Sequence, residues 1–306
     1  MPKVFRFTEY GGPETQEFAD VPRPTAGPSE ILVRVKAAGV NPIDYKIRQG
    51  MLKDFMPLDL PAEFGSEVSG VVEEVGQDVD GFAAGDAVFG ITAATHGGFS
   101  EFTVTSAEVT AKKPPQVSFE DAATLAVAAA TAYDGIVQLD LSEGQTLLIT
   151  GIGGGVGVAA AQIARDSGVA VFGTASEGKR TLVESLGATL IPYGDGVEGR
   201  VRELLPDGVD AIYDLVGGDA LRAVAGLVRD PAKLITSADP GTAAELGGAM
   251  VNRDRTSRVL DEVAALVAEG KLDPHVNDVL SFDDAAQAIA AVESGHPQGK
   301  VVVRIG

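Results

Sequence analysis

The segment best suited to chemistry is a glycine-rich turn near the middle of the chain. Residues 146–157 read Thr-Leu-Leu-Ile-Thr-Gly-Ile-Gly-Gly-Gly-Val-Gly, so a buried-type strand leads through glycines into a helix. Glycine permits a tight turn and lets the backbone approach a pyrophosphate, to which the helix offers free N–H groups and a positive dipole end. A flexible loop is the alternative interpretation, but the strand–turn–helix context makes the motif specific. Gly157 is expected to let the helix pack closely on the strand.

The residues after the next strand predict which dinucleotide binds at this turn. An NAD site usually carries an acidic residue there, which holds the ribose hydroxyls. This chain has Thr174, Ser176, Lys179 and Arg180, whose hydroxyl and cationic groups suit a 2′-phosphate. Glu177 lies among them and is expected to face solvent. An ordinary solvated helix start is the alternative interpretation of Lys179 and Arg180, but cations at a helix start oppose the helix dipole, so an anionic ligand explains them better. We therefore expect the protein to bind NADPH in preference to NADH.

Two patterns of elements position these residues. Up to about residue 118, short strands separated by Gly and Pro suggest a small barrel or sandwich. Ser118 is expected to cap a helix, after which strands alternate with helices as in parallel βαβ units. A closing strand at 300–305 completes either the nucleotide sheet or the first domain. The other expected strands are 31–36, 68–75, 85–90, 101–104, 146–150, 169–174, 189–192, 211–216 and 233–237, and the expected helices are 156–167, 179–186, 256–269 and 282–294.

Composition excludes several other classes of protein. The chain has 306 residues, enough for two domains, and a net charge of −20, which disfavours nucleic acid as a partner. It contains no cysteine, so disulfides, thiol nucleophiles and cysteine-based zinc sites are excluded. We find no signal peptide and no membrane-spanning stretch, and therefore expect a cytoplasmic protein with no membrane partner.

Further motifs are spread over essentially the whole chain. They are Gly39-Val40-Asn41-Pro42-Ile43-Asp44 followed by Arg48-Gln49-Gly50, Gly65-Ser66-Glu67, Gly85-Asp86-Ala87-Val88, Gly97-Gly98-Phe99-Ser100-Glu101-Phe102, Thr131-Ala132-Tyr133, Gln162, and Gly299-Lys300-Val301-Val302. Together they resemble the medium-chain dehydrogenase/reductase superfamily, in its zinc-independent quinone oxidoreductase-like branch. The resemblance implies an α/β fold, with a GroES-like β-barrel substrate domain (1–118 and 256–306), a Rossmann doubly wound parallel-sheet cofactor domain (119–255), and a homodimer.

The resemblance also implies roles for individual residues. Asn41 is expected near the nicotinamide ribose or the substrate oxygen, and Tyr45 and Lys46 are candidate proton donors or oxyanion partners. Packing or solvent exposure beside the cleft is the alternative for Tyr45 and Lys46, whereas Asp44 is expected to organise the local turn. The expected cofactor contacts are Thr131 with the nicotinamide amide, Gly154, Gly155 and Val156 with the pyrophosphate, Ser176, Lys179 and Tyr193 with the 2′-phosphate and adenosine, and Val216, Ser237, Val251 and Lys300 beside the cofactor.

Two departures from the family pattern concern the cofactor site. Ile152 stands where a small residue is usual, and its branched side chain either crowds the cofactor or points into the core. The segment between Ser237 and Val251 is short, in a region where the family often forms nicotinamide and dimer contacts.

The zinc-site positions predict the kind of substrate. Zinc-dependent relatives bind the ion through a cysteine, a histidine and a further cysteine, but Asn41 and Ser66 occupy the first two positions here. His96, His275 and His296 have no ligand spacing and are interpreted as surface residues, with an active-site place as the alternative for His96. No metal site is therefore expected.

Without zinc, substrates that spread negative charge over a conjugated system are favoured over simple ketones. We expect hydride transfer from NADPH to a quinone or an α,β-unsaturated carbonyl compound. An enoyl reductase of a biosynthetic pathway and a non-catalytic NADPH-binding sensor or structural protein are the alternatives.

Overall fold

The computed structural model describes residues 1–295 and 297–306, so that His296 lies outside the described residues. The chain divides into unit 1, which comprises Met1–Val127, Arg255–Ala268 and Val276–Gly306, and unit 2, which comprises Ala128–Asp254 and Glu269–His275. The break expected after residue 118 lies after residue 127 in this division. The reason is that Ser69 Oγ donates to the Phe119 carbonyl and Val127 N donates to Glu67 Oε2, which holds residues 119–127 to unit 1.

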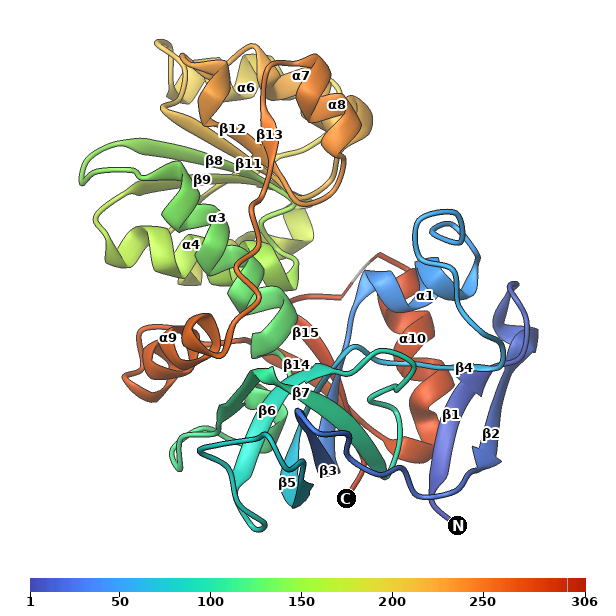
Figure 1. The fold of residues 1–306 in the computed structure, drawn as a ribbon. Coiled ribbons are helices and arrows are strands. Elements are labelled where there is room, and N and C mark those ends of the chain that lie inside the picture. The colour runs from blue at the N-terminus through green and yellow to red at the C-terminus, as the bar shows by residue number, and fades with distance from the viewer. Residues whose placement is uncertain (296) are drawn as a thin grey trace. The chain divides into compact units, whose positions relative to one another are not determined.

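Unit 1 contains two β-sheets (Figure 1). Its strands are β1 (Lys3–Phe7), β2 (Gln16–Asp20), β3 (Glu30–Val40), β4 (Ala62–Glu63), β5 (Glu67–Val75), β6 (Ala87–Thr92), β7 (Phe102–Lys112), β14 (Val276–Ser281) and β15 (Lys300–Arg304). The sheet orders are β2-β1-β4 and β14-β15-β3-β5-β6-β7. Because β3 pairs with β7 as well as with β5, the strands β3, β5, β6 and β7 close into a ring. Of the two alternatives for the closing strand, a return to the first domain is confirmed, since β15 pairs with β3.

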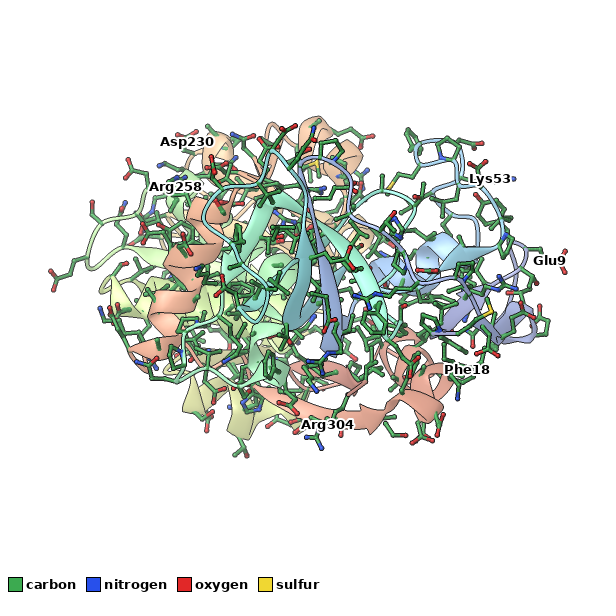
Figure 2. The ribbon with its side chains drawn as sticks, turned by 60° about the horizontal axis from the view of Figure 1, so that its bottom comes forward. Glu9, Phe18, Lys53, Asp230, Arg258 and Arg304 are labelled. Atoms are coloured by element: carbon green, nitrogen blue, oxygen red, sulfur yellow. The ribbon has the colours of Figure 1, made fainter. Side chains whose placement is uncertain are left out.

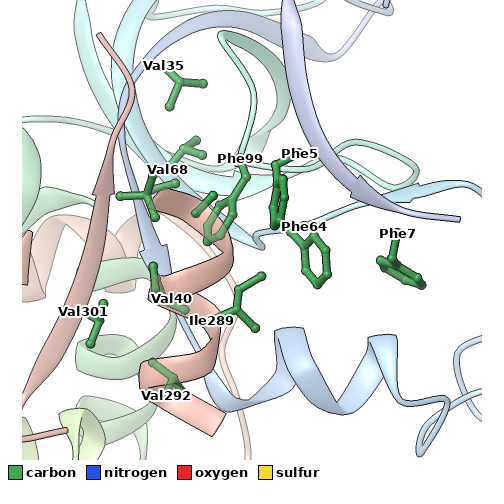
Figure 3. Packing of buried hydrophobic residues seen from close by; sticks show 14 residues of the cluster. Phe5, Phe7, Val35, Val40, Phe64, Val68, Phe99, Ile289, Val292 and Val301 are labelled. Carbon is green, nitrogen blue, oxygen red and sulfur yellow. The ribbon is translucent and has the colours of Figure 1, made fainter. Parts of the chain in front are cut away.

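The core of unit 1 joins segments from both ends of the chain (Figure 3). The ring centroid of Phe64 lies 5.3 Å from that of Phe5 and 5.1 Å from that of Phe7. Ile289 and Val301 belong to the same buried cluster. Since apolar burial is the main driving force of folding, this core needs both ends of the chain. The helices of the unit are α1 (Pro42–Arg48), α2 (Phe119–Ala122), α9 (Ser257–Ala268) and α10 (Ala285–Glu293), with 3₁₀ turns at Pro13–Thr15 and Phe282–Asp284.

Unit 2 is built on a parallel sheet (Figure 1). Its strands are β8 (Thr146–Thr150), β9 (Ala170–Ala175), β10 (Thr189–Pro192), β11 (Ala211–Asp214), β12 (Leu234–Thr236) and β13 (Ala249–Met250). The order β10-β9-β8-β11-β12-β13 is 3-2-1-4-5-6 along the unit, which confirms the doubly wound dinucleotide-binding topology. In such sheets the ligand lies at the carboxyl ends of the strands, where the strand order reverses beside β8.

In unit 2, helix α3 (Ala130–Leu139) leads into β8, and the other helices connect the strands. They are α4 (Gly155–Asp166), α5 (Arg180–Ser185), α6 (Val197–Leu204), α7 (Gly218–Ala225) and α8 (Pro240–Glu245), with 3₁₀ turns at Glu177–Lys179 and Pro231–Lys233. A π-helix at Leu125–Ala129 crosses the boundary between the segments of the two units. Gln162 on α4 holds the separate segment Glu269–His275 to this unit. Its Nε2 donates to the Asp273 carbonyl at 2.8 Å, and Asp273 N donates to its Oε1 at 2.9 Å.

Charged side chains such as Glu9, Lys53 and Arg304 point away from the ribbon (Figure 2). Arg304 forms an ion pair with Glu120 at 2.8 Å, and its side chain is 60% exposed. Exposed pairs of this kind contribute at most about 1 kcal/mol, so the core rather than the surface accounts for stability. In the described ranges, no helix is both long enough and apolar enough to cross a membrane.

Candidate functional site

The glycine-rich turn leaves the start of α4 without a side-chain cap. Gly154 is the N-cap and provides no capping hydrogen bond. The first N–H groups of a helix have no intrahelical acceptor, so those of Gly155 and Val156 are suited to an anion. A Cβ at Gly157 would lie 2.6 Å from the Cα and carbonyl oxygen of Ile152, so Gly157 lets the helix approach the backbone of the turn closely. The turn therefore has the form of a pyrophosphate-binding loop.

Ile152 points into the core of unit 2. It is fully buried, and its side chain covers Gly173 on β9, where a Cβ would meet it at an impossibly short separation. Of the two alternatives for this branched residue, packing in the core is the correct one, and Gly173 provides the space.

Ile152→Ala is expected to lower the free energy of unfolding by about 2 kcal/mol, because it leaves a cavity between the turn and β9. Urea unfolding followed by circular dichroism measures this loss. Ile152→Val, which removes only one methylene, is the control and is expected to cost about 1 kcal/mol. Equal stability of Ile152→Ala and the wild type would contradict the buried placement.

Lys179 lies along the glycine turn. Its Nζ donates to the Gly153 carbonyl at 3.2 Å, and a Cβ at Gly153 would lie 2.4 Å from Lys179 Cδ. Glycine at position 153 thus makes room for the lysine side chain. Lys179 is half-buried, and this desolvation lowers its pKa. One of the two cations expected to meet a 2′-phosphate therefore lies next to the glycine turn.

Arg180 has a different environment. Its guanidinium forms ion pairs with Glu177 and with Glu184, the latter at 3.0 Å. The hydrogen bond from Arg180 lowers the pKa of Glu177, and the two carboxylates raise the pKa of Arg180. The side chain of Glu177 is exposed, as expected. The charge of Arg180 is thus balanced by two acidic neighbours, whereas Lys179 lies along the glycine turn.

The remaining residues expected around the adenosine lie at the ends of β9 and β10. Thr174 is buried, and its carbonyl accepts hydrogen bonds from the N–H groups of Gly151 and Ile152, at 3.0 and 3.2 Å. Ser176 is the N-cap of the following 3₁₀ turn and forms no side-chain capping bond. Tyr193 is 65% exposed. The structure thus places Thr174 against the turn and leaves Tyr193 accessible.

A buried carboxylate that the sequence analysis missed, Asp214, joins three strand ends in unit 2. Its Oδ1 accepts hydrogen bonds from Thr150 Oγ1 at 2.6 Å, Val216 N at 3.2 Å and Gly217 N at 3.0 Å. Its Oδ2 accepts one from Thr236 Oγ1 at 2.6 Å. Asp214 is fully buried, so these bonds compensate for its lost hydration. The group fixes the loop after β11, which carries the expected cofactor residue Val216.

The other expected cofactor residues of unit 2 are held by backbone hydrogen bonds. Ser237 N donates to the Asp214 carbonyl at 3.0 Å, and Val251 N donates to the Thr236 carbonyl at 2.9 Å. On α3, the carbonyl of Thr131 accepts a hydrogen bond from Tyr213 Oη at 2.8 Å. Val216 is exposed, whereas Thr131 and Val251 are buried.

In unit 1, the expected catalytic residues lie on or beside α1. Asn41 is the N-cap, and its N–H donates to Asp44 Oδ2 at 2.7 Å, which confirms that Asp44 organises this turn. Tyr45 is half-buried against the apolar core, and burial raises its pKa. Lys46 is partly exposed. Arg48, which is buried, anchors the helix through an ion pair with the partly exposed Glu293 on α10 at 3.0 Å.

A buried polar cluster surrounds Asn41. Lys300 Nζ donates to Asn41 Oδ1 at 2.7 Å and to Glu67 Oε1 at 2.9 Å, and Asn41 Nδ2 donates to the same Glu67 oxygen at 2.8 Å. All three residues are at least 95% buried. Sequence reasoning missed Glu67 as a member of this site, although it placed the Gly65-Ser66-Glu67 motif. Burial raises the pKa of nearby Asp44 to about 7, while Lys300 acts in the opposite direction.

The Ser66 hydroxyl is shielded from solvent and has no hydrogen-bond partner among the residues described. Within the same residues, no three His, Cys, Asp or Glu side chains are grouped so as to hold a metal ion. His96 and His275 are both half-buried rather than fully exposed. The polar side chains joined around Asn41 are thus its own amide, the carboxyls of Asp44 and Glu67 and the ammonium of Lys300.

Comparisons with known proteins agree with both units. Residues 27–115 match the alcohol dehydrogenase GroES-like domain family, and residues 186–303 match the zinc-binding dehydrogenase family. The chain is 32% identical to the 2-methylene-furan-3-one reductase of Solanum lycopersicum, over 98% of this chain and 78% of that protein. Among solved structures, the quinone oxidoreductase of Coxiella burnetii superposes with a TM-score of 0.89 at 29% identity, over 100% of this chain and 99% of the other.

A mycobacterial protein complexed with NADPH superposes with a TM-score of 0.87 at 29% identity, over 99% of this chain and 100% of the other. The GroES-like ring of unit 1, the Rossmann sheet of unit 2 and these relatives lead to one conclusion. The chain belongs to the quinone oxidoreductase-like branch of the medium-chain dehydrogenase/reductase superfamily.

Proposed function

We propose that this protein binds NADPH and reduces quinones or α,β-unsaturated carbonyl compounds without a metal ion. The observation that carries the proposal is the uncapped glycine turn with Lys179 along it. Bound NADPH supplies the hydride. The N–H groups of Gly155 and Val156 are suited to the pyrophosphate, and Lys179 to the 2′-phosphate, with Ser176 and Tyr193 near the adenosine.

The substrate class follows from the donors near α1. Asn41, Tyr45 and Lys46 provide hydrogen-bond donors but no Lewis acid, and Asn41 and Ser66 stand at two positions that hold zinc in the zinc-dependent relatives. Hydrogen bonds suffice when the incoming negative charge is spread over a conjugated system. The tomato relative is named for an enone substrate and the Coxiella relative for quinones, which supports this class.

The cofactor preference is tested by titrating NADPH and NADH into the wild type and Lys179→Met. We expect the wild type to bind NADPH more tightly. The substitution should weaken NADPH binding roughly 10- to 100-fold, as expected for a charged hydrogen bond, and leave NADH binding unchanged. Lys233→Met is the matched control, since Lys233 is also half-buried in unit 2 and donates to a backbone carbonyl, that of Leu139. Equal affinity of the wild type for both cofactors would refute the preference.

The reaction is tested by following NADPH oxidation with 1,4-benzoquinone, an enal and a saturated ketone, each with and without a chelator. Turnover of the conjugated acceptors alone, unaffected by the chelator, is the expected result. Chelator-sensitive reduction of the ketone would contradict the metal-free proposal. Tight NADPH binding without any turnover would favour the non-catalytic alternative, and exclusive turnover of enoyl thioesters would favour the biosynthetic enoyl reductase.

The homodimer and the cytoplasmic location stay predictions. Light scattering after size-exclusion chromatography measures the oligomeric state, for which we expect twice the chain mass of 31.4 kDa.

A further inference from the structure

The ammonium group of Lys300 has a full set of hydrogen-bond acceptors. It donates to the Val40 carbonyl at 3.2 Å, to Asn41 Oδ1 at 2.7 Å and to Glu67 Oε1 at 2.9 Å. An ammonium has three N–H donors, and all three are used here. The side chain is 5% exposed. Lys300 therefore has no donor left for a ligand unless this cluster opens.

These bonds allow only one orientation of the Asn41 carboxamide. Its oxygen faces the Lys300 ammonium, and its Nδ2 donates to Glu67 Oε1 at 2.8 Å. The reversed orientation would place the amide NH₂ against an ammonium and the amide oxygen against a carboxylate. Glu67 is itself fixed, because its other oxygen accepts the Val127 N–H at 2.8 Å. The cluster thus holds the carboxamide from two sides.

We propose that Lys300 is a positioning residue, which fixes the Asn41 carboxamide rather than contacting the cofactor. The inference rests on the proposed function, in which Asn41 meets the nicotinamide ribose or the substrate oxygen. In the fixed orientation the second Nδ2 hydrogen of Asn41 has no acceptor in the described part of the chain. It can therefore donate to an oxygen of the nicotinamide ribose or of the substrate. Lys300 acts on the reaction through Asn41.

A double-mutant cycle separates this role from direct cofactor contact. The variants are Lys300→Met, Asn41→Ala and their combination, with kcat, KM and the NADPH dissociation constant measured using 1,4-benzoquinone. We expect Lys300→Met to lower kcat/KM roughly 10- to 100-fold in the wild type but less than about twofold when Asn41 is already alanine. Equal losses in both backgrounds, or no loss in either, would overturn the proposal. Lys112→Met is the control, because Lys112 pairs with Asp86 at 3.0 Å on the exposed surface and should leave activity unchanged.

A second variant keeps the test valid if Lys300→Met unfolds. Removing the lysine leaves the Glu67 carboxylate buried without a counter-charge, which is strongly destabilising. The pair Lys300→Met/Glu67→Gln removes one positive and one negative charge together. We expect it to fold while kcat/KM stays low, since Asn41 Oδ1 still lacks its partner. Full recovery of kcat/KM in this pair would show that Lys300 provides charge balance only.

The side-chain amide signals of Asn41 in a ¹H–¹⁵N spectrum give a readout independent of turnover. A fixed carboxamide is expected to show slow hydrogen exchange in the wild type and at least about tenfold faster exchange in the charge-compensated pair. Unchanged exchange would overturn the positioning role. If the wild type reduces no acceptor, the proposed function fails, and this measurement still decides whether Lys300 fixes Asn41.

Discussion

Replacement of Asp214 by alanine is expected to lower the free energy of unfolding by about 4 kcal/mol. The carboxylate accepts hydrogen bonds from the hydroxyls of Thr150 and Thr236 and from the N–H groups of Val216 and Gly217. Alanine leaves these four donors without their acceptor, at a cost of about 1 kcal/mol or more each. Urea unfolding measures the loss. Because the loop with Val216 is released, NADPH binding should weaken as well.

Two further substitutions define how Asp214 acts. Asp214→Asn keeps one acceptor oxygen and should lose about half as much stability as Asp214→Ala. Asp219→Ala is the matched control, because Asp219 is exposed on α7, and its removal should cost less than about 1 kcal/mol. An Asp214→Ala variant as stable as the Asp219 control would show that the strand ends hold together without the carboxylate.

Asp44 is expected to make the stability of the protein fall as the pH rises. Burial raises the pKa of this carboxyl from 3.8 to about 7 in the folded chain. Between pH 3.8 and about 7 the folded chain holds a proton on Asp44 that the unfolded chain has released, so raising the pH favours unfolding. Above the folded pKa, Asp44 changes the free energy of unfolding no further. Each pH unit within this window costs about 1.4 kcal/mol, or about 3 kcal/mol between pH 4.5 and 8.

The Asp44 contribution is isolated by comparison with Asp44→Asn. Asparagine keeps an oxygen to accept the Asn41 N–H but does not titrate. The free energy of unfolding of the wild type, minus that of the variant, should therefore decrease by about 3 kcal/mol from pH 4.5 to 8. A difference that is constant with pH, or that increases, would contradict the raised pKa.

The parts of the fold with strong local patterns were predictable from the sequence. The strand at Thr146–Thr150 and the helix after the glycine turn were placed within one residue, because burial, glycine and helical periodicity agree there. Helix α1 was missed, since its seven residues, Pro42 included, are too few to show a period. Strand β14 was missed because it lies at a sheet edge with mostly exposed or half-buried residues, and therefore lacks apolar alternation.

The residues of the candidate site also divide into those that a local sequence pattern predicts and those that it does not. Lys179 follows β9, the strand after the glycine turn, so the pattern of one strand–helix–strand unit was enough to find it. The partners Asn41, Glu67 and Lys300 come from three separate segments, and only the sheet order β15-β3-β5 brings them together. Asp214 gave a weak signal, an acidic residue at the end of an apolar strand. Its importance depends on the strands at either side, which carry Thr150 and Thr236.

The place of β15 inside the larger sheet of unit 1 has a consequence for synthesis. This strand lies between β14 and β3, yet it is translated after every other strand of the two units. All six strands of unit 2 have been synthesised before Lys300 is added. Unit 2 can therefore form its sheet while the first part of unit 1 still lacks strand β15. Until Arg304 emerges, the end of β3 at residues 37–40 lacks the partner that β15 provides, and nascent chains at this stage are open to pairing with other strands there.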